Sequence, residues 1–290
     1  MLYKEIEKRN GKQLAYVRTN DWKKNVILFF HGFCGSKEYF PDMDYNDETC
    51  IVSFDRPGIG ESSVKKYYSM ESFLTDVHEV LMEHLVSSVS VIGHSAGGYY
   101  AQVFAQMYPK EVKSLSLVSS MIPLNSPSTR KLVKGQWKFI AILSLRFKRF
   151  SRLYFRKMAS GIIQGYEKRL ASNMEKLLPM EKQFMEENHD MIKNAVLNAV
   201  ANEGAGVCYD AHAMCQKREE VSIPNDIPVF VWHGAEDTTI PISFTEFFKS
   251  AYFVKEEHII DDAGHMLYLP YWKEIIEEAT RQSKNGKSQI

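Results

Sequence analysis

The stretch "VSVIGHSAGGYY", residues 89–100, joins a strand-like pattern to a helix-like pattern through a glycine-rich turn. Its first five residues are mostly apolar and β-branched, as is typical of a buried strand, and residues 96–109 follow a helical pattern that ends at a proline. Gly93 and Gly97 stand two positions to either side of Ser95, where a Cβ atom would crowd a sharp turn. The pattern predicts that the Ser95 hydroxyl is exposed above a sheet, at a helix N-terminus that favours negative charge.

Similar strand-like segments, apolar throughout, recur towards both ends of the chain. They lie at 25–32, 50–55, 89–93, 114–120, 227–234 and 256–265. Helical patterns occur at 69–85, 96–109, 243–252 and 270–281. This alternation predicts an α/β fold with a mostly parallel central sheet and helices on both of its faces. The first residues, 2–19, predict a hairpin of edge strands that turns at Asn10 and Gly11, and residues 283–290 predict a frayed polar tail.

The segment 123–220 shows no strand pattern, and its helical patterns are interrupted at Gly135, Gly161, Gly165, Pro179 and Gly204. We interpret it as a helical cap inserted into one α/β sheet domain, whose first part is 1–122 and whose second part is 221–290. Every charged residue from 130 to 157 is Lys or Arg, and these cations alternate with aromatic and aliphatic residues. Two interpretations stay open. The cap accepts an anionic or acyl-chain substrate or touches a membrane, or it is a two-helix cap whose cations simply face water.

The composition is that of an ordinary globular protein. Hydrophobic residues make up 44% and charged residues 25%, which predicts a packed core, and 36 basic residues balance 36 acidic ones, which gives no reason to expect a nucleic-acid partner. The N-terminus lacks the apolar core of a signal peptide, and no apolar run is long enough for a membrane span. Four scattered cysteines fit reduced thiols and match no zinc spacing. We therefore expect a cytoplasmic protein without a metal.

A serine hydroxyl is a weak nucleophile unless a base removes its proton, and nine histidines compete for that role. His265 is the best candidate because it follows a predicted strand and the short loop "DDAG". That position is at the carboxyl edge of the sheet, where the sites of parallel sheets collect. His94 adjoins Ser95 in the chain, and its side chain is expected to point away from the serine.

The acid that orients this base is found by elimination. It could follow the strand at 114–120 or the strand at 227–234, but no Asp or Glu occurs anywhere in 112–166. The later segment "HGAEDTTIP" offers Glu236 and Asp237, and we prefer Asp237 because Glu236 is expected to face solvent. The two aspartates just before His265 are too near it in the chain for an easy approach. The predicted order is therefore Ser95, Asp237, His265, that is, nucleophile, acid and base.

Five segments together resemble the α/β-hydrolase superfamily, in particular its capped esterase, lipase and peptidase-like branch. They are "HGFCGS", "DRPGIGES", "GHSAGG", "HGAEDTTIP" and "DAGH", spaced from residue 31 to residue 265. The resemblance covers the sheet domain, roughly two thirds of the chain, and leaves out the insertion, which in such enzymes varies and sets substrate choice. It implies an oxyanion hole formed by the backbone N–H groups of Phe33 and Ala96.

The activity that follows is a serine hydrolase that cleaves a small to medium carboxylic ester, or a related acyl compound, through an acyl-enzyme. The expected partner is a small-molecule acyl substrate, no cofactor is implied, and the oligomeric state stays open. A serine at position 95, rather than an aspartate, argues against epoxide-hydrolase and dehalogenase chemistry. The alternatives are a ligand receptor or signalling protein with little turnover, an aminopeptidase-like enzyme, and a lactone or C–C bond hydrolase.

Other residues near these motifs have supporting roles in this interpretation. Asp55 and Arg56 are expected to fix the loop beneath the site. His31 is expected to brace the loop that begins directly after His31 itself. The segment "DRPGIGES" is no nucleotide-binding loop, since it lacks both glycine-rich phosphate patterns. Five aromatic residues of the insertion are candidates for the walls of a substrate pocket: Trp137, Phe139, Phe147, Tyr154 and Phe155.

Overall fold

The computed structural model describes residues 2–9, 11–22, 25–41, 43, 45, 48–175 and 177–285. Asn10, half of the predicted hairpin turn, lies outside these residues, as does 286–290 of the predicted tail. Within the described part, no helix has both the length and the apolar character needed to cross a bilayer.

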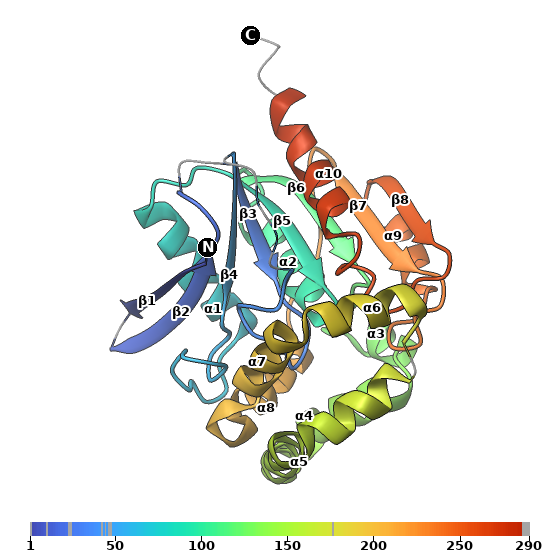
Figure 1. Cartoon of the computed structure of the whole chain (residues 1–290). Coiled ribbons are helices and arrows are strands. Elements are labelled where there is room, and N and C mark those ends of the chain that lie inside the picture. Colours follow the sequence, from blue (N-terminus) through green and yellow to red (C-terminus); the bar gives the residue numbers. More distant parts are fainter. Residues whose placement is uncertain are drawn as a thin grey trace.

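One sheet of eight strands runs through the described residues in the order β1–β2–β4–β3–β5–β6–β7–β8 (Figure 1). β1 pairs with β2 in an antiparallel hairpin, and β2 is also antiparallel to β4. All other neighbouring strands are parallel. The strands are β1 Tyr3–Arg9, β2 Lys12–Arg18, β3 Asn25–Phe30, β4 Thr49–Phe54, β5 Val89–His94, β6 Val112–Val118, β7 Val229–Gly234 and β8 Val254–Ile260. The predicted α/β fold with a mostly parallel sheet is thus confirmed.

Two details of the strand prediction are wrong. The hairpin does not consist of two edge strands, because β2 pairs with β4 on its other side and only β1 lies at the edge. The last strand is not apolar throughout, since Lys255, Glu256 and Glu257 are exposed on β8. Its edge position explains this, because an edge strand has one side open to water and charged side chains there discourage pairing with another chain.

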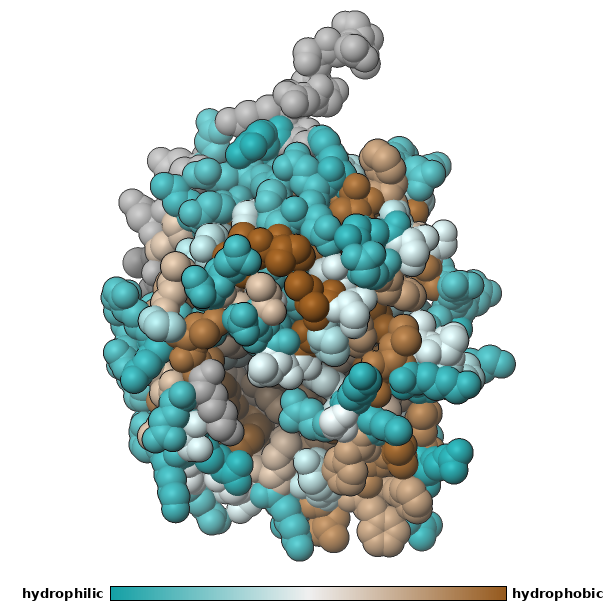
Figure 2. All heavy atoms as spheres, turned by 90° about the vertical axis from the view of Figure 1, so that its right-hand side faces the viewer, coloured by the Kyte–Doolittle hydropathy of each residue, from teal (hydrophilic) through white to brown (hydrophobic). Residues whose placement is uncertain are grey.

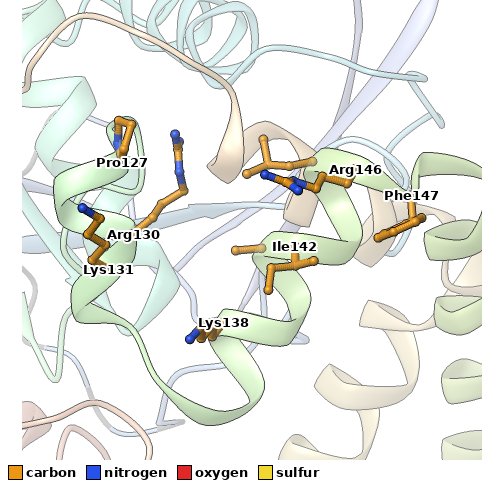
Figure 3. A pocket seen from close by; sticks show the side chains of 9 residues that line it. Pro127, Arg130, Lys131, Lys138, Ile142, Arg146 and Phe147 are labelled. Atoms are coloured by element: carbon orange, nitrogen blue, oxygen red, sulfur yellow. The ribbon is translucent and has the colours of Figure 1, made fainter.

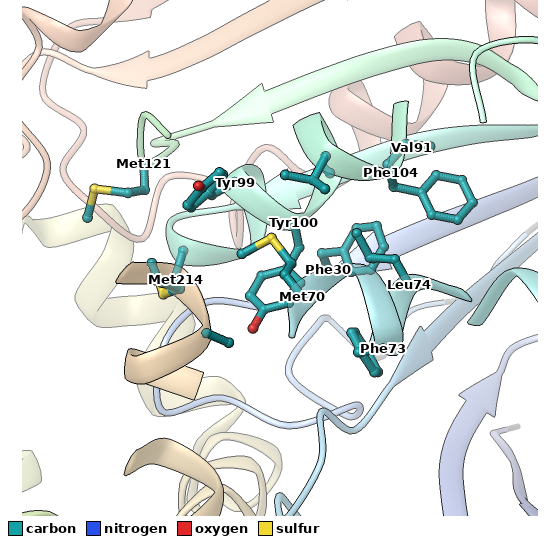
Figure 4. Packing of buried hydrophobic residues seen from close by; sticks show 14 of the residues in the cluster. Phe30, Met70, Phe73, Leu74, Val91, Tyr99, Tyr100, Phe104, Met121 and Met214 are labelled. Atoms are coloured by element: carbon teal, nitrogen blue, oxygen red, sulfur yellow. The ribbon is translucent and has the colours of Figure 1, made fainter. Parts of the chain in front are cut away.

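Helices cover both faces of the sheet, because side chains alternate between the faces along each strand. α2 (Ala96–Met107) packs on one face of β3, β5 and β6, where the β3 side chains Val26 and Leu28 belong to its core cluster. α10 (Trp272–Asn285) packs on the opposite face, where the alternate β3 side chains Ile27 and Phe29 belong to a second cluster. α1 (Met70–Glu83) packs against α2, and α9 (Phe244–Ala251) contacts β7. Figure 4 shows the core on the α2 side, where Met214 of the insertion joins Tyr99 and Met70.

Six helices lie between β6 and β7, all within the predicted segment 123–220: α3 Pro127–Leu132, α4 Gly135–Arg146, α5 Lys148–Met174, α6 Pro179–Glu187, α7 His189–Ala199 and α8 Ala201–Cys215. The interpretation of this segment as a two-helix cap is therefore wrong, since its described residues form six helices. The expected interruption at Gly161 is also wrong, since α5 continues through it and deviates from helical geometry only at Gly165. In Figure 1 the arrowheads of β3, β5, β6 and β7 point towards the side on which α4–α8 lie.

Candidate active site

Ser95 occupies a strained turn between β5 and α2. Its φ of 54° and ψ of −125° place a non-glycine residue in a backbone region that costs energy. The two flanking glycines make the turn possible. A Cβ atom on Gly93 would lie 2.5 Å from the Cα of Gly98, and a Cβ on Gly97 would collide with the carbonyl oxygen of Phe30. The sequence thus forces the Ser95 hydroxyl to the carboxyl edge of the sheet.

The structure brings Ser95, His265 and Asp237 together. Ser95 Oγ lies 3.0 Å from His265 Nε2, and His265 Nδ1 lies 2.8 Å from Asp237 Oδ2. A carboxylate only accepts, so Nδ1 carries the proton and donates it, which leaves Nε2 free to accept from the serine hydroxyl. Ser95 follows the carboxyl end of β5, Asp237 that of β7 and His265 that of β8. Because these ends lie at one edge of the sheet, residues 170 positions apart in the chain can meet.

Asp237 is held in the ionised form. Burial raises its pKa, but the hydrogen bond and charge of His265 and the backbone N–H of Ile240 outweigh burial, so the pKa lies below its usual value. Asp237 Oδ1 accepts hydrogen bonds from the N–H groups of Thr239 (2.8 Å) and Ile240 (2.9 Å). The loop therefore fixes the carboxylate through one oxygen and leaves the other for His265.

His94 supports His265 through the backbone of His265, and the expectation that the His94 side chain points away from the Ser95 hydroxyl stays a prediction. Its Nε2–H donates to the carbonyl oxygen of His265 at 3.0 Å, and its ring packs on that of Tyr268 with centroids 4.1 Å apart. Burial, and then the charge of His265, lower the pKa of His94 to about 3. The neutral imidazole thus acts as a packed hydrogen-bond donor.

The loop after β3 lies directly against the Ser95 turn. A Cβ on Gly32 would approach Ser95 Cβ to 3.3 Å, and Phe33 follows immediately. Arg56 fixes this loop, because its two terminal nitrogens donate to the carbonyl oxygens of His31 and Gly32 at 2.8 Å each. On the other side, Ala96 is the first residue of α2, where a backbone N–H has no acceptor within the helix. The loop that carries Phe33 and the first residue of α2 therefore both adjoin Ser95, and the oxyanion role of the Phe33 and Ala96 N–H groups stays a prediction.

Two buried ion pairs anchor the neighbouring turn. Asp55 accepts from the backbone N–H of Lys37 and from its Nζ, both at 2.8 Å. Arg56 in turn meets Asp210 of α8, with Nε 3.0 Å from Oδ2. The expectation that Asp55 and Arg56 fix the loop agrees with these contacts, whereas Lys37 and Asp210 were missed. A signal for Asp210 exists in the sequence, since it is the lone acid in the apolar run "GAGVCYDAHAMC".

Glu181 of α6 was also missed, and it contacts the loop that carries His265. Its Oε1 accepts from the N–H groups of Gly264 (3.1 Å) and Met266 (2.7 Å), one on each side of the histidine. Its side chain is almost fully buried. The sequence "LPMEK" explains Glu181 as a helix-capping residue, and Oε2 does accept from the N–H of Leu178 at 3.4 Å. The contact with the histidine loop depends on how the insertion folds back.

The candidate wall residues divide into two groups. The ring of Trp137 lies 5.3 Å, and that of Phe155 6.2 Å, from the ring of Phe33, and both side chains are buried. Phe139 and Phe147 are instead exposed, each at 49%, so the structure places them on the outside of the insertion and away from Phe33. Tyr154, 39% exposed, packs on Phe139 with ring centroids 5.3 Å apart. Periodicity alone did not indicate which aromatic residues turn inwards.

Two groups of acidic and histidine side chains in the described residues are close enough to share an ion: Glu5 with Glu7 and His84, and Glu256 with His258 and Glu278. Neither contains a residue of the Ser95 site. Both are engaged within the protein, through hydrogen bonds from Tyr16 to Glu5 and from the Trp232 indole to Glu278. The sequence expectation that no metal or cofactor takes part stays a prediction.

Comparison with known proteins identifies the family. A model of the alpha/beta hydrolase fold matches residues 25–270, so the chain belongs to the alpha/beta hydrolase family. Lipase 1 of Psychrobacter immobilis is 34% identical over 40% of this chain, and the match spans only 38% of that lipase. Lipase 3 of Moraxella sp. (strain TA144) is 22% identical over 91% of this chain and 78% of its own length. An esterase from Thermogutta terrifontis superposes with a TM-score of 0.66 at 19% identity, covering 98% of both chains, a likeness of fold.

Proposed function

We propose that this chain is a serine hydrolase that cleaves a small to medium carboxylic ester by way of an acyl-enzyme. One observation carries the proposal: the continuous hydrogen-bonded arrangement Ser95–His265–Asp237, at 3.0 and 2.8 Å, on a strained turn at the N-terminus of α2. Similarity to proteins named as lipases agrees with it. Ser95, Asp237 and His265 follow one another along the chain in the order nucleophile, acid and base that is typical of α/β-hydrolase triads.

The steps follow from the geometry. Ser95 Oγ attacks the ester carbonyl carbon as its proton passes to His265 Nε2, and the carbonyl oxygen takes up the negative charge. The N–H groups of Phe33 and Ala96 stabilise that charge, with a donor of this kind worth about 3–4 kcal/mol. His265 then gives the proton to the departing alkoxide, which leaves an acyl group on Ser95. His265 takes a proton from a water molecule as this water attacks the acyl group, and it then returns the proton to Ser95 Oγ as the acid is released.

Asp237 has two roles in these steps. It holds His265 in the tautomer that can accept a proton from Ser95, and it stabilises the imidazolium that forms when the proton arrives. The lowered pKa of Asp237 keeps it ionised, so it serves as an electrostatic partner and is not itself protonated.

Ester cleavage is favoured over epoxide opening by the identity of residue 95. An aspartate there would form an ester with an opened epoxide, whereas a serine needs an acyl or comparable electrophile to give an intermediate that water can hydrolyse. The apolar surroundings agree with an acyl group, since the Phe33 loop contacts the buried rings of Trp137 and Phe155. We infer that these two rings limit the acyl chain length.

A panel of p-nitrophenyl esters from acetate to dodecanoate tests the proposal. Wild-type protein should hydrolyse part of the panel, and Ser95→Ala should lower kcat by about a millionfold, the loss seen when a triad serine is removed. Trp137→Ala should shift the preferred ester towards longer acyl chains without abolishing turnover. Wild-type protein that cleaves none of the esters, or Ser95→Ala protein with wild-type rates, would contradict the proposal.

A further inference from the structure

Helix α4 is apolar on both of its faces, although only one face is buried. Trp137 and Leu143 point into the molecule, whereas Phe139, Ile142 and Leu145 are between 43% and 49% exposed. A helix on the surface of a globular protein normally presents polar residues to water, and an apolar outer face needs an explanation. The exposed side of α4 is thus an apolar surface that the fold leaves uncovered.

This surface belongs to a larger apolar region. Of the nineteen large apolar side chains exposed among the described residues, eight fall between positions 132 and 154. Apolar side chains are visible towards the lower end of the face in Figure 2, the end at which Figure 1 places α4 and α5. We define the α4 outer face as Lys138, Phe139, Ile142, Leu145, Arg146 and Phe147, all of them exposed.

A groove of about 660 Å³ lies between α3 and the α4 outer face. Figure 3 shows Arg130 on α3 and Arg146 on α4 with their side chains in the space between the two helices, and Ile142 between them on the α4 side. Lys131 and Lys138 also line the groove. The groove is therefore lined by both positively charged and apolar side chains. This combination suits a molecule with an anionic head and an apolar tail.

Most cations between residues 130 and 157 form no ion pair with a carboxylate among the described residues. No charged residue from 130 to 157 is acidic, and in this segment the ion pairs among described residues are those of Arg152 and Arg156 with Glu203. Lys138 and Arg146 form no ion pair with any carboxylate that the structure describes. The positive charge of the α4 outer face is therefore available to an external anion, although the whole chain has equal numbers of acidic and basic residues.

We propose that the α4 outer face docks on the surface of a bilayer that contains anionic phospholipids. Phe139, Ile142 and Leu145 enter the boundary between headgroups and acyl chains, while Lys138 and Arg146 meet the lipid phosphates. A second copy of this chain fits the surface less well, because the same face on two copies would bring like charges together. The docking is peripheral, through one side of a short helix.

The docked face lies on the same helix as a residue of the candidate site. Trp137 contacts Phe33 from the inner side of α4, with ring centroids 5.3 Å apart, while its neighbour Lys138 faces outwards. Docking would thus hold the bilayer against the helix that covers the loop beside Ser95. The binding itself does not rest on the proposed hydrolase function, and it should be unchanged in the Ser95→Ala variant.

Vesicle co-sedimentation with full-length Ser95→Ala protein tests the proposal and avoids lipid cleavage during the measurement. The protein should pellet with phosphatidylcholine vesicles that contain one third phosphatidylglycerol, bind less as salt is raised, and bind poorly to pure phosphatidylcholine. Adding Lys138→Glu and Arg146→Glu together should weaken binding by at least about 25-fold, at about fivefold for each cation lost. Phe139→Ser, Ile142→Ser and Leu145→Ser together should weaken it by more than about tenfold.

Matched variants elsewhere on the surface show whether the effect belongs to α4. Lys273→Glu and Phe253→Ser change one exposed cation and one exposed apolar residue far from the insertion in sequence, and both should bind like the parent. Circular dichroism should show that every variant stays folded. The proposal is overturned by absence of pelleting, by equal loss in the control variants, or by binding that is the same with and without phosphatidylglycerol. Sedimentation velocity measures whether the protein forms a dimer in solution. A dimer that the α4 variants abolish would assign the α4 outer face to a second copy of the chain and would also overturn the proposal.

Discussion

Arg56 and Asp210 form a buried ion pair that joins the sheet domain to the insertion, with Arg56 Nε 3.0 Å from Asp210 Oδ2. The other Asp210 oxygen accepts from the Tyr100 hydroxyl at 2.6 Å. Arg56 also holds the carbonyl oxygens of His31 and Gly32. One guanidinium therefore links α8 to the loop beside Ser95, so the fold of the insertion and the geometry of the site are coupled.

Asp210→Asn should destabilise the protein by about 3–5 kcal/mol, because it leaves the buried Arg56 charge without its partner. Urea unfolding of this variant and of wild-type protein measures the difference. Asp226→Asn removes an exposed carboxylate and should change the free energy of unfolding by less than about 0.5 kcal/mol. A loss below about 1 kcal/mol in Asp210→Asn would show that the ion pair does not hold the two parts together.

Glu181→Ala should lower kcat by between about tenfold and about a hundredfold, because two N–H groups flanking His265 lose their acceptor and the imidazole shifts. Glu181→Gln should recover most of this loss, since an amide oxygen can still accept. Glu186→Ala, an exposed glutamate on the same helix, is the matched control. Steady-state kinetics on a p-nitrophenyl ester would argue against the positioning role if both alanine variants behaved alike.

Asp237→Asn should lower kcat by about 10⁴ while KM changes little, because the amide no longer favours the tautomer that accepts the Ser95 proton. Glu236→Gln changes the neighbouring, exposed carboxylate and should keep wild-type kinetics. If Glu236→Gln caused the larger loss, the elimination that led to Asp237 would be wrong.

His94 makes the stability of the fold sensitive to acid. Its pKa in the folded protein is lowered to about 3 from 6.5, so below pH 6.5 the unfolded chain binds a proton that the folded protein excludes. The free energy of unfolding should therefore fall as the pH drops from 6.5 towards about 3, with about 2 kcal/mol lost at about pH 5 from this group.

His94→Gln lacks this titration but retains a donor for the His265 carbonyl. The stability difference between wild-type protein and the variant should therefore shrink by about 2 kcal/mol between pH 7 and about pH 5, as measured by urea unfolding at each pH. The other buried histidines are common to both proteins and cancel. Parallel decreases in both would show that His94 is not the source of the acid sensitivity.

The sheet, and the meeting of Ser95, Asp237 and His265 at one of its edges, could be predicted because local pattern decides where the strands end. Buried strands read as apolar runs, and parallel strands bring their carboxyl ends to one edge, so residues that follow β5, β7 and β8 must be neighbours. The insertion could not be predicted to the same depth. Helical periodicity indicates which side chains share a face, but not what the face contacts.

Two outcomes illustrate this limit. Trp137 and Phe139 are two positions apart in one apolar run, yet one packs on Phe33 and the other is exposed, because the orientation of α4 depends on contacts with α5 and α8. Glu181 fits a helix-capping pattern, and its contact with the His265 loop joins residues 85 positions apart in the chain. Such contacts follow from tertiary packing alone.

The central claim is that Ser95 is an activated nucleophile, and fluorophosphonate labelling followed by mass spectrometry of the peptides tests it most directly. Wild-type protein should gain one phosphonyl group, on the peptide that contains Ser95, and Ser87→Ala, which removes an exposed serine just before β5, should label equally. Ser95→Ala should not label. Modification of another residue in wild-type protein, or labelling that persists in Ser95→Ala, would contradict the account.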